Sequence, residues 1–405
     1  MTTAHRGNRL QIAILGRCNT GKSTILNRIT GQQGALVSER AGTTADPVQV
    51  HFELLPYGPV TFYDTAGMDE AGALGALRLD SARKIMARAD IALVVTDESG
   101  LGQAELALID ELLALETPVL VVFNKGDIMP PRRQDTDFCK AKAIPGIVST
   151  PADDADPAPL RESLLALAPR QADQQIVCDL LSPASTVICL TPIDASAPKG
   201  RLIVPQVQVL RELVEADHVV LLAQGKDLPQ TLARLAGAPD MVITDSQVVK
   251  EVVAALPEAI RVTTFSMLFA RLKGDFPLQY AGARQIALLR EGDAVLIAEA
   301  CSHHAQSDDI ARVKIPQLLQ KRAGCSLEFS FYAGGDFPDD LSRYKLVLHC
   351  GGCMLNRREM LRRLRVCAQN GVPVTNYGMA ISFAQGVLER VAHPILQAGH
   401  MAFPL

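Results

Sequence analysis

The sequence predicts an α/β protein of three domains. Most of the expected strands are continuous apolar runs, as in sheets that are buried on both faces. Amphipathic segments of helical period stand between them, which is typical of a doubly wound sheet. The 405 residues exceed one ordinary core, and stretches rich in Pro, Ala and Asp separate three blocks. We place the domains at 1–172, 173–270 and 271–405.

The expected elements follow this division in chain order. In the first block, two of the clearest helices are 23–30 and 104–116. Its strands are expected at 9–16, 48–54, 60–67, 91–97, 118–124 and 146–149. A smaller α/β domain follows, with strands at 185–191, 218–224, 241–247 and 260–266. The last domain has strands at 293–300, 326–334, 344–352 and 372–378.

Composition limits the classes of partner. The chain is 48% hydrophobic and 21% charged, as in soluble globular proteins, and its net charge of -4 gives no general attraction for nucleic acid or anionic membranes. The first residues lack the apolar core of a signal peptide, and no run reaches the roughly 18 apolar residues of a membrane span. We therefore expect a cytoplasmic protein that binds neither nucleic acid nor membrane. Nine cysteines in a reducing compartment favour metal ligation or burial over disulfides.

A phosphate-binding loop stands near the start of the chain. The stretch "GRCNTGKS", residues 16–23, follows a predicted strand and precedes a helix, as a P-loop requires. Gly16 and Gly21 allow backbone N–H groups to cradle phosphates. Lys22 is expected to reach the β- and γ-phosphates, and the Ser23 hydroxyl to hold magnesium.

Two further motifs identify the nucleotide. In "DTAG", Asp64 offers a carboxylate to the magnesium shell and Gly67 an N–H to the γ-phosphate. In "NKGD", the carboxylate of Asp127 can accept the two N–H groups on the edge of guanine, a pair that adenine lacks. The predicted cofactors are therefore GTP and magnesium. The expected contacts are Gly16, Asn19, Gly21, Lys22, Ser23, Thr24, Asp64, Asn124, Lys125, Asp127 and Ser149.

Residues 9–150 resemble the translation-factor-class GTPases, in the branch that contains MnmE and Era. The resemblance implies that Thr43 or Thr44 in "AGTTADP", with Thr44 preferred, closes over magnesium, although Ala45 replaces the usual Arg. Met68 replaces the Gln that orients water in Ras-like enzymes, so we expect slow hydrolysis. The resemblance also implies that Asn19 holds a potassium ion in place of an arginine finger; the alternative is an Asn that serves only the turn. The expected catalytic group is Lys22, Thr44, Asp64, Gly67 and Asn19.

Thiols and imidazoles follow two strands of the last domain. Cys301 and His303 form C-x-H, and His349, Cys350 and Cys353 form H-C-x-x-C. Ligands of open α/β sheets collect beyond the carboxyl ends of strands, so the two halves are expected to converge.

Two nearby residues, Cys325 and His304, are not counted among the expected ligands. Cys325 opens its strand and is expected at the opposite edge, and His304 is read as a turn residue. The converging residues fit a closed Cys₃His zinc site or an iron-sulfur cluster with one open position. Spacing alone does not separate these two, and simple burial of the thiols is the third possibility.

The whole chain resembles the GTPases that mature FeFe-hydrogenase, the HydF family. The likeness rests on this GTPase block, "TPIDASAPKGRLIVPQVQ", the two thiol motifs and "TNYGMAISFAQG". It implies a 4Fe-4S cluster on Cys301, Cys350 and Cys353, with His303 and His349 as the fourth ligand or as neighbouring hydrogen-bond donors. It also implies a homodimer formed through the middle domain. Such a protein is a scaffold that receives a diiron precursor from two radical enzymes and delivers it to the hydrogenase apo-protein.

Two other functions remain at this point. One is a zinc-bearing RNA-modification or ribosome-assembly GTPase, against which the acidic balance counts. The other is a structural zinc domain joined to a GTPase. The helix at 356–365 carries five Arg, which we read as a solvated face or as a docking surface for an acidic partner or anionic cargo.

Overall fold

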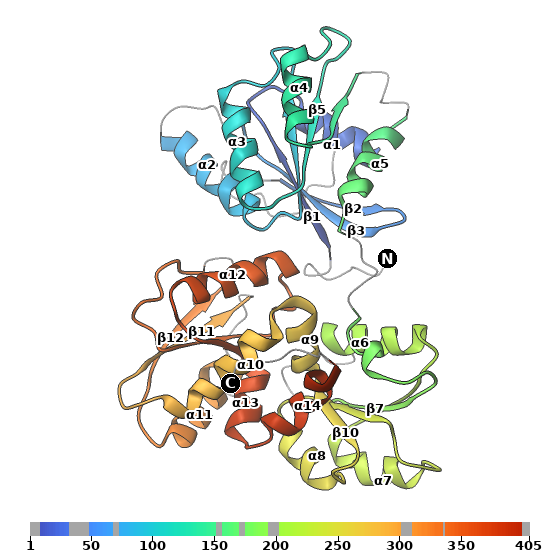
Figure 1. The fold of residues 1–405 in the computed structure, drawn as a ribbon, viewed down its shortest axis with the longest axis vertical. Coiled ribbons are helices and arrows are strands. Elements are labelled where there is room, and N and C mark those ends of the chain that lie inside the picture. Colours follow the sequence, from blue (N-terminus) through green and yellow to red (C-terminus); the bar gives the residue numbers. More distant parts are fainter. Residues whose placement is uncertain are drawn as a thin grey trace. The chain divides into compact units, whose positions relative to one another are not determined.

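A computed structural model shows an α/β chain in two compact units, Met1–Gln171 and Ala172–Leu405 (Figure 1). It describes residues 9–31, 48–67, 73–150, 156–169, 175–192, 202–300, 310–334 and 337–398. The predicted fold class is confirmed. No helix in these ranges is long and apolar enough to cross a bilayer.

The first unit is a doubly wound sheet of six strands in the order β2-β3-β1-β4-β5-β6. Only β2 runs antiparallel to its neighbour. The strands are β1 (Leu10–Leu15), β2 (Val48–Leu54), β3 (Gly58–Asp64), β4 (Ile91–Thr96), β5 (Val119–Phe123) and β6 (Gly146–Val148). The helices are α1 (Lys22–Thr30), α2 (Ala73–Met86), α3 (Gln103–Ala114), α4 (Arg133–Ala141) and α5 (Ala158–Leu167). All six strands fall where the apolar runs predict them.

The central strands of this sheet are apolar throughout because both faces are covered. Ala13 and Leu15 of β1 face one core, which α2, α3 and α4 complete, whereas Ile12 and Ile14 face a second core with α1 and α5 (Figure 1). Alternate residues of a strand point to opposite faces, so neither face tolerates polar side chains.

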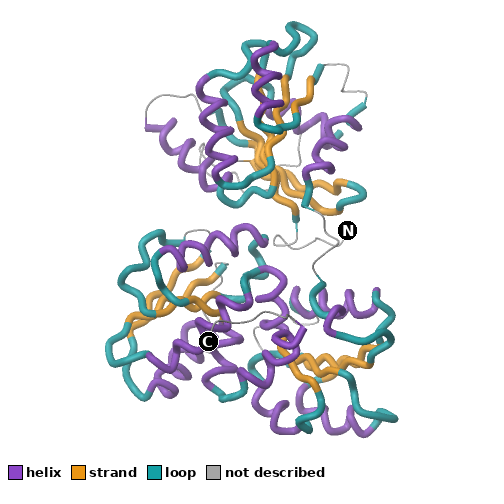
Figure 2. Tube along the Cα trace, in the orientation of Figure 1, coloured by secondary structure: helices purple, strands orange, loops and turns teal. Residues whose placement is uncertain are grey.

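The second unit contains two four-stranded sheets, both parallel (Figure 2). The middle sheet has the order β10-β9-β7-β8, with β7 (Thr186–Leu190), β8 (Val219–Ala223), β9 (Met241–Thr244) and β10 (Arg261–Thr264). The C-terminal sheet has the order β12-β11-β13-β14, with β11 (Ala294–Glu299), β12 (Glu328–Ala333), β13 (Leu346–His349) and β14 (Val374–Asn376). In each sheet the first strand lies between the second and the third.

Nine α-helices in the described part of this unit cover the two sheets. They are α6 (Val204–Glu215), α7 (Leu228–Ala233), α8 (Val249–Ala255), α9 (Phe265–Lys273), α10 (Phe276–Arg284), α11 (Ile315–Ala323), α12 (Arg357–Gln369), α13 (Tyr377–Ala384) and α14 (Leu388–Ala398). Single short turns lie at Cys178–Leu180, Gly225–Asp227, Gln285–Leu288 and Ile310–Lys314. Although α14 ends the described chain, its Leu388, Val391 and Ile395 pack in the core of the middle sheet.

Candidate nucleotide and thiolate sites

The P-loop joins β1 to α1 and needs glycine at two positions. Gly16 has φ +145°, and a Cβ there would lie 2.3 Å from the Val95 carbonyl oxygen. Gly21 has φ +91°, and a Cβ there would lie 2.1 Å from Asn124 Nδ2. Side chains rarely adopt such angles, and here they would also collide, so the motif spacing follows from geometry.

The predicted phosphate and magnesium groups lie together at the end of the P-loop. The buried Lys22 Nζ donates to the carbonyls of Gly16, at 3.2 Å, and Arg17, at 2.6 Å. Ser23 Oγ donates to Asp64 Oδ2 at 2.5 Å. Burial raises the pKa of Asp64, while the Ser23 hydrogen bond and the Lys22 charge oppose that shift. A hydroxyl and a carboxylate at this spacing suit one hard cation.

"DTAG" packs directly on the P-loop. A Cβ on Gly67 would lie 2.1 Å from Cys18 Sγ, and Thr65 Oγ1 donates to the Ile14 carbonyl at 2.7 Å. These contacts hold the end of β3 beside the end of β1. Thr44 and Met68 lie outside the described residues.

Asn19 and Thr24 are both exposed beside the phosphate cradle. Asn19 has φ +61°, a conformation that Asn adopts more readily than most residues. The turn alone therefore accounts for an Asn at this position, as one of the two sequence interpretations expects.

The guanine-recognition loop is tied to the P-loop by Asn124 and to α1 by an arginine that sequence reasoning missed. Asn124 Nδ2 donates to the Thr20 carbonyl at 2.9 Å. The buried Arg28 of α1 donates to Asn124 Oδ1 at 3.2 Å and to Ser149 Oγ at 2.7 Å. The Ser149 hydroxyl is thus turned to Arg28. The sequence did carry a signal for this role, because Arg28 is a charged residue on the apolar side of the predicted helix 23–30.

Two other residues of the loop reach outward. Asp127 is exposed. Lys125 has φ +57°, and its Nζ lies 3.1 Å from Glu98 Oε2. The Asp127 carboxylate is therefore accessible for the recognition that the sequence assigns to it.

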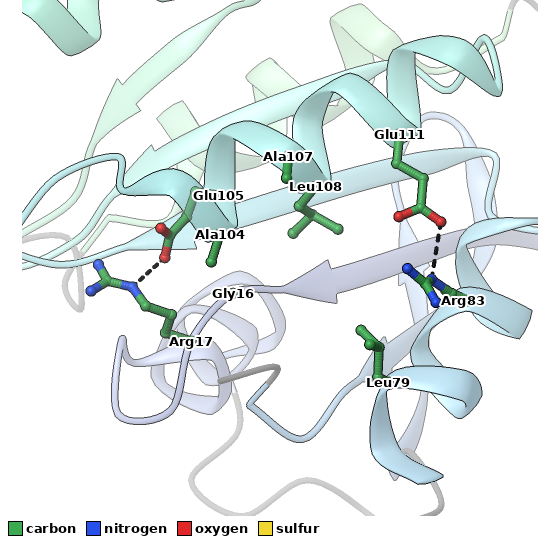
Figure 3. A pocket seen from close by; sticks show the side chains of 9 residues that line it. All are labelled: Gly16, Arg17, Leu79, Arg83, Ala104, Glu105, Ala107, Leu108 and Glu111. Atoms are coloured by element: carbon green, nitrogen blue, oxygen red, sulfur yellow. Dashed lines mark hydrogen bonds and ion pairs between the residues drawn. The ribbon is translucent and has the colours of Figure 1, made fainter. Parts of the chain in front are cut away.

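A pocket of about 180 Å³ borders the other side of the P-loop (Figure 3). It is lined by Gly16, Arg17, Leu79, Arg83, Ala104, Glu105, Ala107, Leu108 and Glu111. Arg17 forms an ion pair with the buried Glu105 of α3, and Arg83 of α2 pairs with Glu111 at 3.3 Å. Apart from Gly16, no predicted nucleotide contact lines it, so the pocket is separate from the phosphate cradle.

The strands that lead into the two halves of the thiol motif, β11 and β13, are paired parallel neighbours. The backbone N–H of Ala300, which immediately precedes Cys301, donates to Cys350 Sγ at 3.1 Å. The Cys350 N–H donates to the Ala298 carbonyl at 2.9 Å. Cys350 and Cys353 are half-buried, and both sulfurs are free of disulfides.

The structure does not describe the first thiol motif, and it confirms the position of Cys325, which was not expected to be a ligand. Cys301 and His303 lie outside the described residues, and within the described ranges no three ligand-type side chains gather as a metal site. Cys325 precedes β12, at the opposite end of the parallel sheet from Cys350, as predicted.

His349 supports the loop through both ring nitrogens. Its Nδ1 lies 2.7 Å from the Cys350 carbonyl oxygen, and Arg363 Nη1 lies 3.1 Å from its Nε2. With Arg363 as the donor, the ring proton belongs on Nδ1. Burial, with the Arg363 charge, lowers the pKa of His349 to about 4. This geometry favours the hydrogen-bonding role over ligation, because a ligand would have to give up one of these bonds.

Arg363 is the centre of a buried network under the loop. The side chain is 1% exposed, donates to Glu359 Oε1 at 2.7 Å and to the Gly334 carbonyl at 3.0 Å, and lies 5.3 Å from the Phe337 ring centroid. Burial opposes ionisation of Glu359, but Arg362 and Arg363 outweigh it and lower its pKa. The sequence interpretation of a solvated or docking face is therefore wrong for Arg363.

A second buried cation approaches from α9. Lys273 Nζ donates to the Leu355 carbonyl at 3.0 Å and lies 3.5 Å from the Cys353 carbonyl oxygen. Burial lowers the pKa of Lys273 to about 8, and a negative charge on Cys353 acts against that shift. Sequence reasoning missed this residue, since it lies about 80 positions from the loop.

These observations fit a cluster held by thiolates. The Cys350 sulfur already accepts an N–H hydrogen bond, of the kind that stabilises cluster thiolates. Buried donors hold the carbonyls of Cys350, Cys353 and Leu355. The loop is therefore fixed by the protein itself, and its Cys350 sulfur lies beside Ala300, the residue before Cys301.

Family models cover most of the chain. Residues 176–274 match the hydrogen maturase F dimerization domain, and residues 277–394 match the hydrogen maturase F tetramerization domain. These two together cover more than half of the chain. Residues 11–125 match the 50S ribosome-binding GTPase model.

Individual relatives match part of the chain. The tRNA modification GTPase MnmE of Paramagnetospirillum magneticum is 40% identical over 124 residues, which are 30% of this chain and 26% of that protein. The GTPase Era of Alkaliphilus oremlandii is 33% identical over 120 residues, 29% of this chain and 40% of that protein. The solved structure of Aquifex aeolicus Era is 18% identical, with a TM-score of 0.33, over 56% of this chain and 98% of that one. The chain thus spans about a quarter of the length of the MnmE relative.

Proposed function

Because the chain belongs to the hydrogen maturase F family, we propose that it is a GTPase that carries a 4Fe-4S cluster and delivers a diiron precursor to FeFe-hydrogenase. The observation that supports the cluster assignment is the 3.1 Å hydrogen bond from Ala300 N–H to Cys350 Sγ, because it joins the residue before Cys301 to the second thiol motif. The similarity to MnmE covers 30% of this chain and 26% of that protein, which is too little to support RNA modification.

In the nucleotide site, we assign Lys22 to the β- and γ-phosphates and Ser23 with Asp64 to magnesium. Gly67 N–H is assigned to the γ-phosphate and Asp127 to guanine. Arg28 holds Asn124, which in turn holds the P-loop through Thr20. Thr44 and a potassium ion on Asn19 are assigned from the resemblance to the MnmE and Era branch.

Steady-state phosphate release tests this half of the proposal. We expect GTP to be hydrolysed slowly, ATP much more slowly, and potassium to stimulate more than sodium. Lys22→Ala should abolish turnover. Equal rates with GTP and ATP would refute the guanine assignment, and equal rates with sodium and potassium would refute the role of Asn19.

In the thiol site, Cys301, Cys350 and Cys353 would hold the cluster. With three thiolates, one iron keeps an exchangeable position to which a donor atom of a cargo can bind. The protein's own contribution is to fix the loop. His349 donates to the Cys350 carbonyl, Arg363 holds His349, and Ala300 N–H donates to the Cys350 sulfur.

The edge strand of the middle sheet is the surface we assign to dimerisation. On β8, Val219 is 56% exposed and Leu222 is 48% exposed, and the adjacent α6 exposes Val207 and Val214. An unpaired apolar edge invites pairing with another strand. The match of residues 176–274 to a dimerization domain agrees with this choice. Val219→Asp should shift the protein toward monomer in analytical ultracentrifugation, while Val148→Asp, on the edge strand β6, should not.

The nucleotide and thiol residues belong to different compact units. We therefore assign GTP to the control of partner contacts, since a γ-phosphate reshapes only what the switch loops touch. Lys22→Ala should keep its cluster and accept a chemically supplied diiron mimic, yet activate hydrogenase poorly in cells with the two radical-enzyme maturases. Cys350→Ser should hydrolyse GTP normally and activate by neither route. Failure of preloaded Lys22→Ala to activate hydrogenase in vitro would place GTP turnover in delivery itself.

A further inference from the structure

The thiol loop has a buried cation that the proposed mechanism does not use. Lys273 is only 5% exposed, although lysine is among the residues least often buried. Its ammonium lies against the loop through the carbonyls of Cys353 and Leu355, and 6.0 Å from the Phe269 ring centroid. Removing an ammonium from water costs free energy, so a buried ammonium needs a nearby negative charge or dipole that compensates for the lost hydration.

The helix that carries Lys273 belongs to the middle sheet. Met267, Leu268, Phe269 and Ala270 of α9 are part of the middle-sheet core. The helix ends at Gly274, whose N–H donates to the Ala270 carbonyl at 3.0 Å. Lys273 thus stands in the last helical turn, where the helix dipole favours a positive charge. The rigid core of one sheet therefore holds a cation against the ligand loop of the other.

The charge next to Lys273 explains why a cation would be placed there. A negative charge on the Cys353 side chain favours the charged form of Lys273, whose Nζ lies 3.5 Å from the Cys353 carbonyl oxygen. A 4Fe-4S core on three thiolates carries a net negative charge, which grows by one unit when the cluster takes up an electron. A fixed positive charge beside the ligand stabilises the reduced cluster more than the oxidised one.

We propose that Lys273 is a positioning residue that completes the cluster site from the middle sheet, holding the Cys353–Leu355 turn and raising the cluster's reduction potential. The inference rests on the proposed function, because it requires a cluster on Cys353. The electron comes from an external low-potential reductant, and no bond to Lys273 is made or broken.

The experiment compares four full-length proteins: wild type, Lys273→Met, Lys273→Arg and Lys345→Met. Lys345 is the matched control, since it is an exposed lysine that precedes β13 and so lies at the opposite end of that strand from Cys350. Each protein is reconstituted anaerobically with ferrous iron and sulfide, and its iron content is measured. The midpoint potential is then determined by a dithionite titration followed by electron paramagnetic resonance.

We expect Lys273→Met to keep its iron and to have a more negative midpoint potential than wild type and Lys345→Met, with Lys273→Arg close to wild type. A potential in Lys273→Met equal to that of the control would overturn the inference. If Lys273→Met loses iron, Lys273→Arg decides: wild-type iron and potential support the role of the charge, and equal loss of iron contradicts it. A wild-type protein that binds no cluster would instead refute the proposed function.

Discussion

The middle and C-terminal sheets share one topology and differ in the residues just beyond their strands. In both, the first strand lies between the second and the third. The second strand is therefore added on one side of the first strand and the third strand on its other side. Such a switch point is where open parallel sheets bind ligands. At that point β9 of the middle sheet is followed by Asp245 and Ser246, whereas β13 of the C-terminal sheet is followed directly by Cys350.

In the middle sheet, protein fills the space beyond the strands. Ser246 Oγ lies 3.0 Å from Ser266 Oγ. A Cβ on Gly378, at the start of α13, would lie 2.2 Å from Ser266 Cβ and 2.5 Å from Ser246 Oγ. In the C-terminal sheet the corresponding loop presents thiols instead. Topology thus supplies the location, and the side chains after the strands decide whether it is packed or binds a ligand.

The largest effect should come from the thiols themselves. Cys350→Ser and Cys353→Ser should each abolish iron binding after anaerobic reconstitution, because a hydroxyl is a poor replacement for a cluster thiolate. Ser246→Ala, in the loop that follows β9 of the middle sheet, and Cys325→Ser should retain the iron. Iron and sulfide analysis measures all four variants, and a Cys350→Ser protein with full iron would remove the distinction between the sheets.

The next effect concerns the buried network of Arg363, Glu359 and His349 under the thiol loop of the C-terminal sheet. Arg363→Leu should lower the unfolding free energy of the iron-free protein by about 3 kcal/mol, because buried partners lose their donor. The exposed Arg365 on the same helix is the control, and its replacement by Leu should change stability by less than about 0.5 kcal/mol. Equal effects in denaturant unfolding would show that Arg363 is not structurally special.

A pH effect of similar or smaller size follows from His349. Its pKa is 6.5 in the unfolded chain and about 4 in the fold, so between these values the unfolded state binds the extra proton. The iron-free protein should therefore lose up to about 3 kcal/mol of stability as pH falls from 6.5 to 4. Urea unfolding of wild type and His349→Gln isolates this contribution. Parallel curves for the two proteins would contradict the burial of a neutral imidazole.

The smallest effect tests the packed end of the middle sheet. Gly378→Ala should cost about 1–3 kcal/mol, since its methyl group would overlap the side chains of Ser266 and Ser246. Gly237→Ala is the control, because a Cβ there meets no atom within 4 Å. Thermal unfolding compares the two, and an unchanged midpoint for Gly378→Ala would mean that this end of the sheet is loosely filled.

The sequence predicted the strands because their signal is local. Continuous apolar runs bounded by turn residues marked β1, β4 and β5 in the first unit and β11 and β13 in the second, and all lie where they were expected. The P-loop glycines were equally readable, since the close contacts at Gly16 and Gly21 permit no other residue. That β11 and β13, the strands before the two thiol motifs, lie side by side is confirmed, and it follows from parallel pairing of segments far apart in sequence.

Residues whose role depends on tertiary packing could not be predicted. Lys273 and Cys353 are 80 positions apart, and nothing local indicates that α9 ends beside the thiol loop. Arg363 looked like one of five solvated arginines until α12 placed it under His349. The packing of α14 in the middle-sheet core is a third case, because a helix pattern gives its apolar face but not the sheet that receives it.

Metal analysis of the anaerobically purified full-length chain tests the central claim most directly. We predict a brown protein that contains about four irons per chain with matching sulfide, and little zinc. A colourless protein with stoichiometric zinc and no sulfide would contradict it, because the thiol loop would then be a closed structural site with no position to offer a cargo.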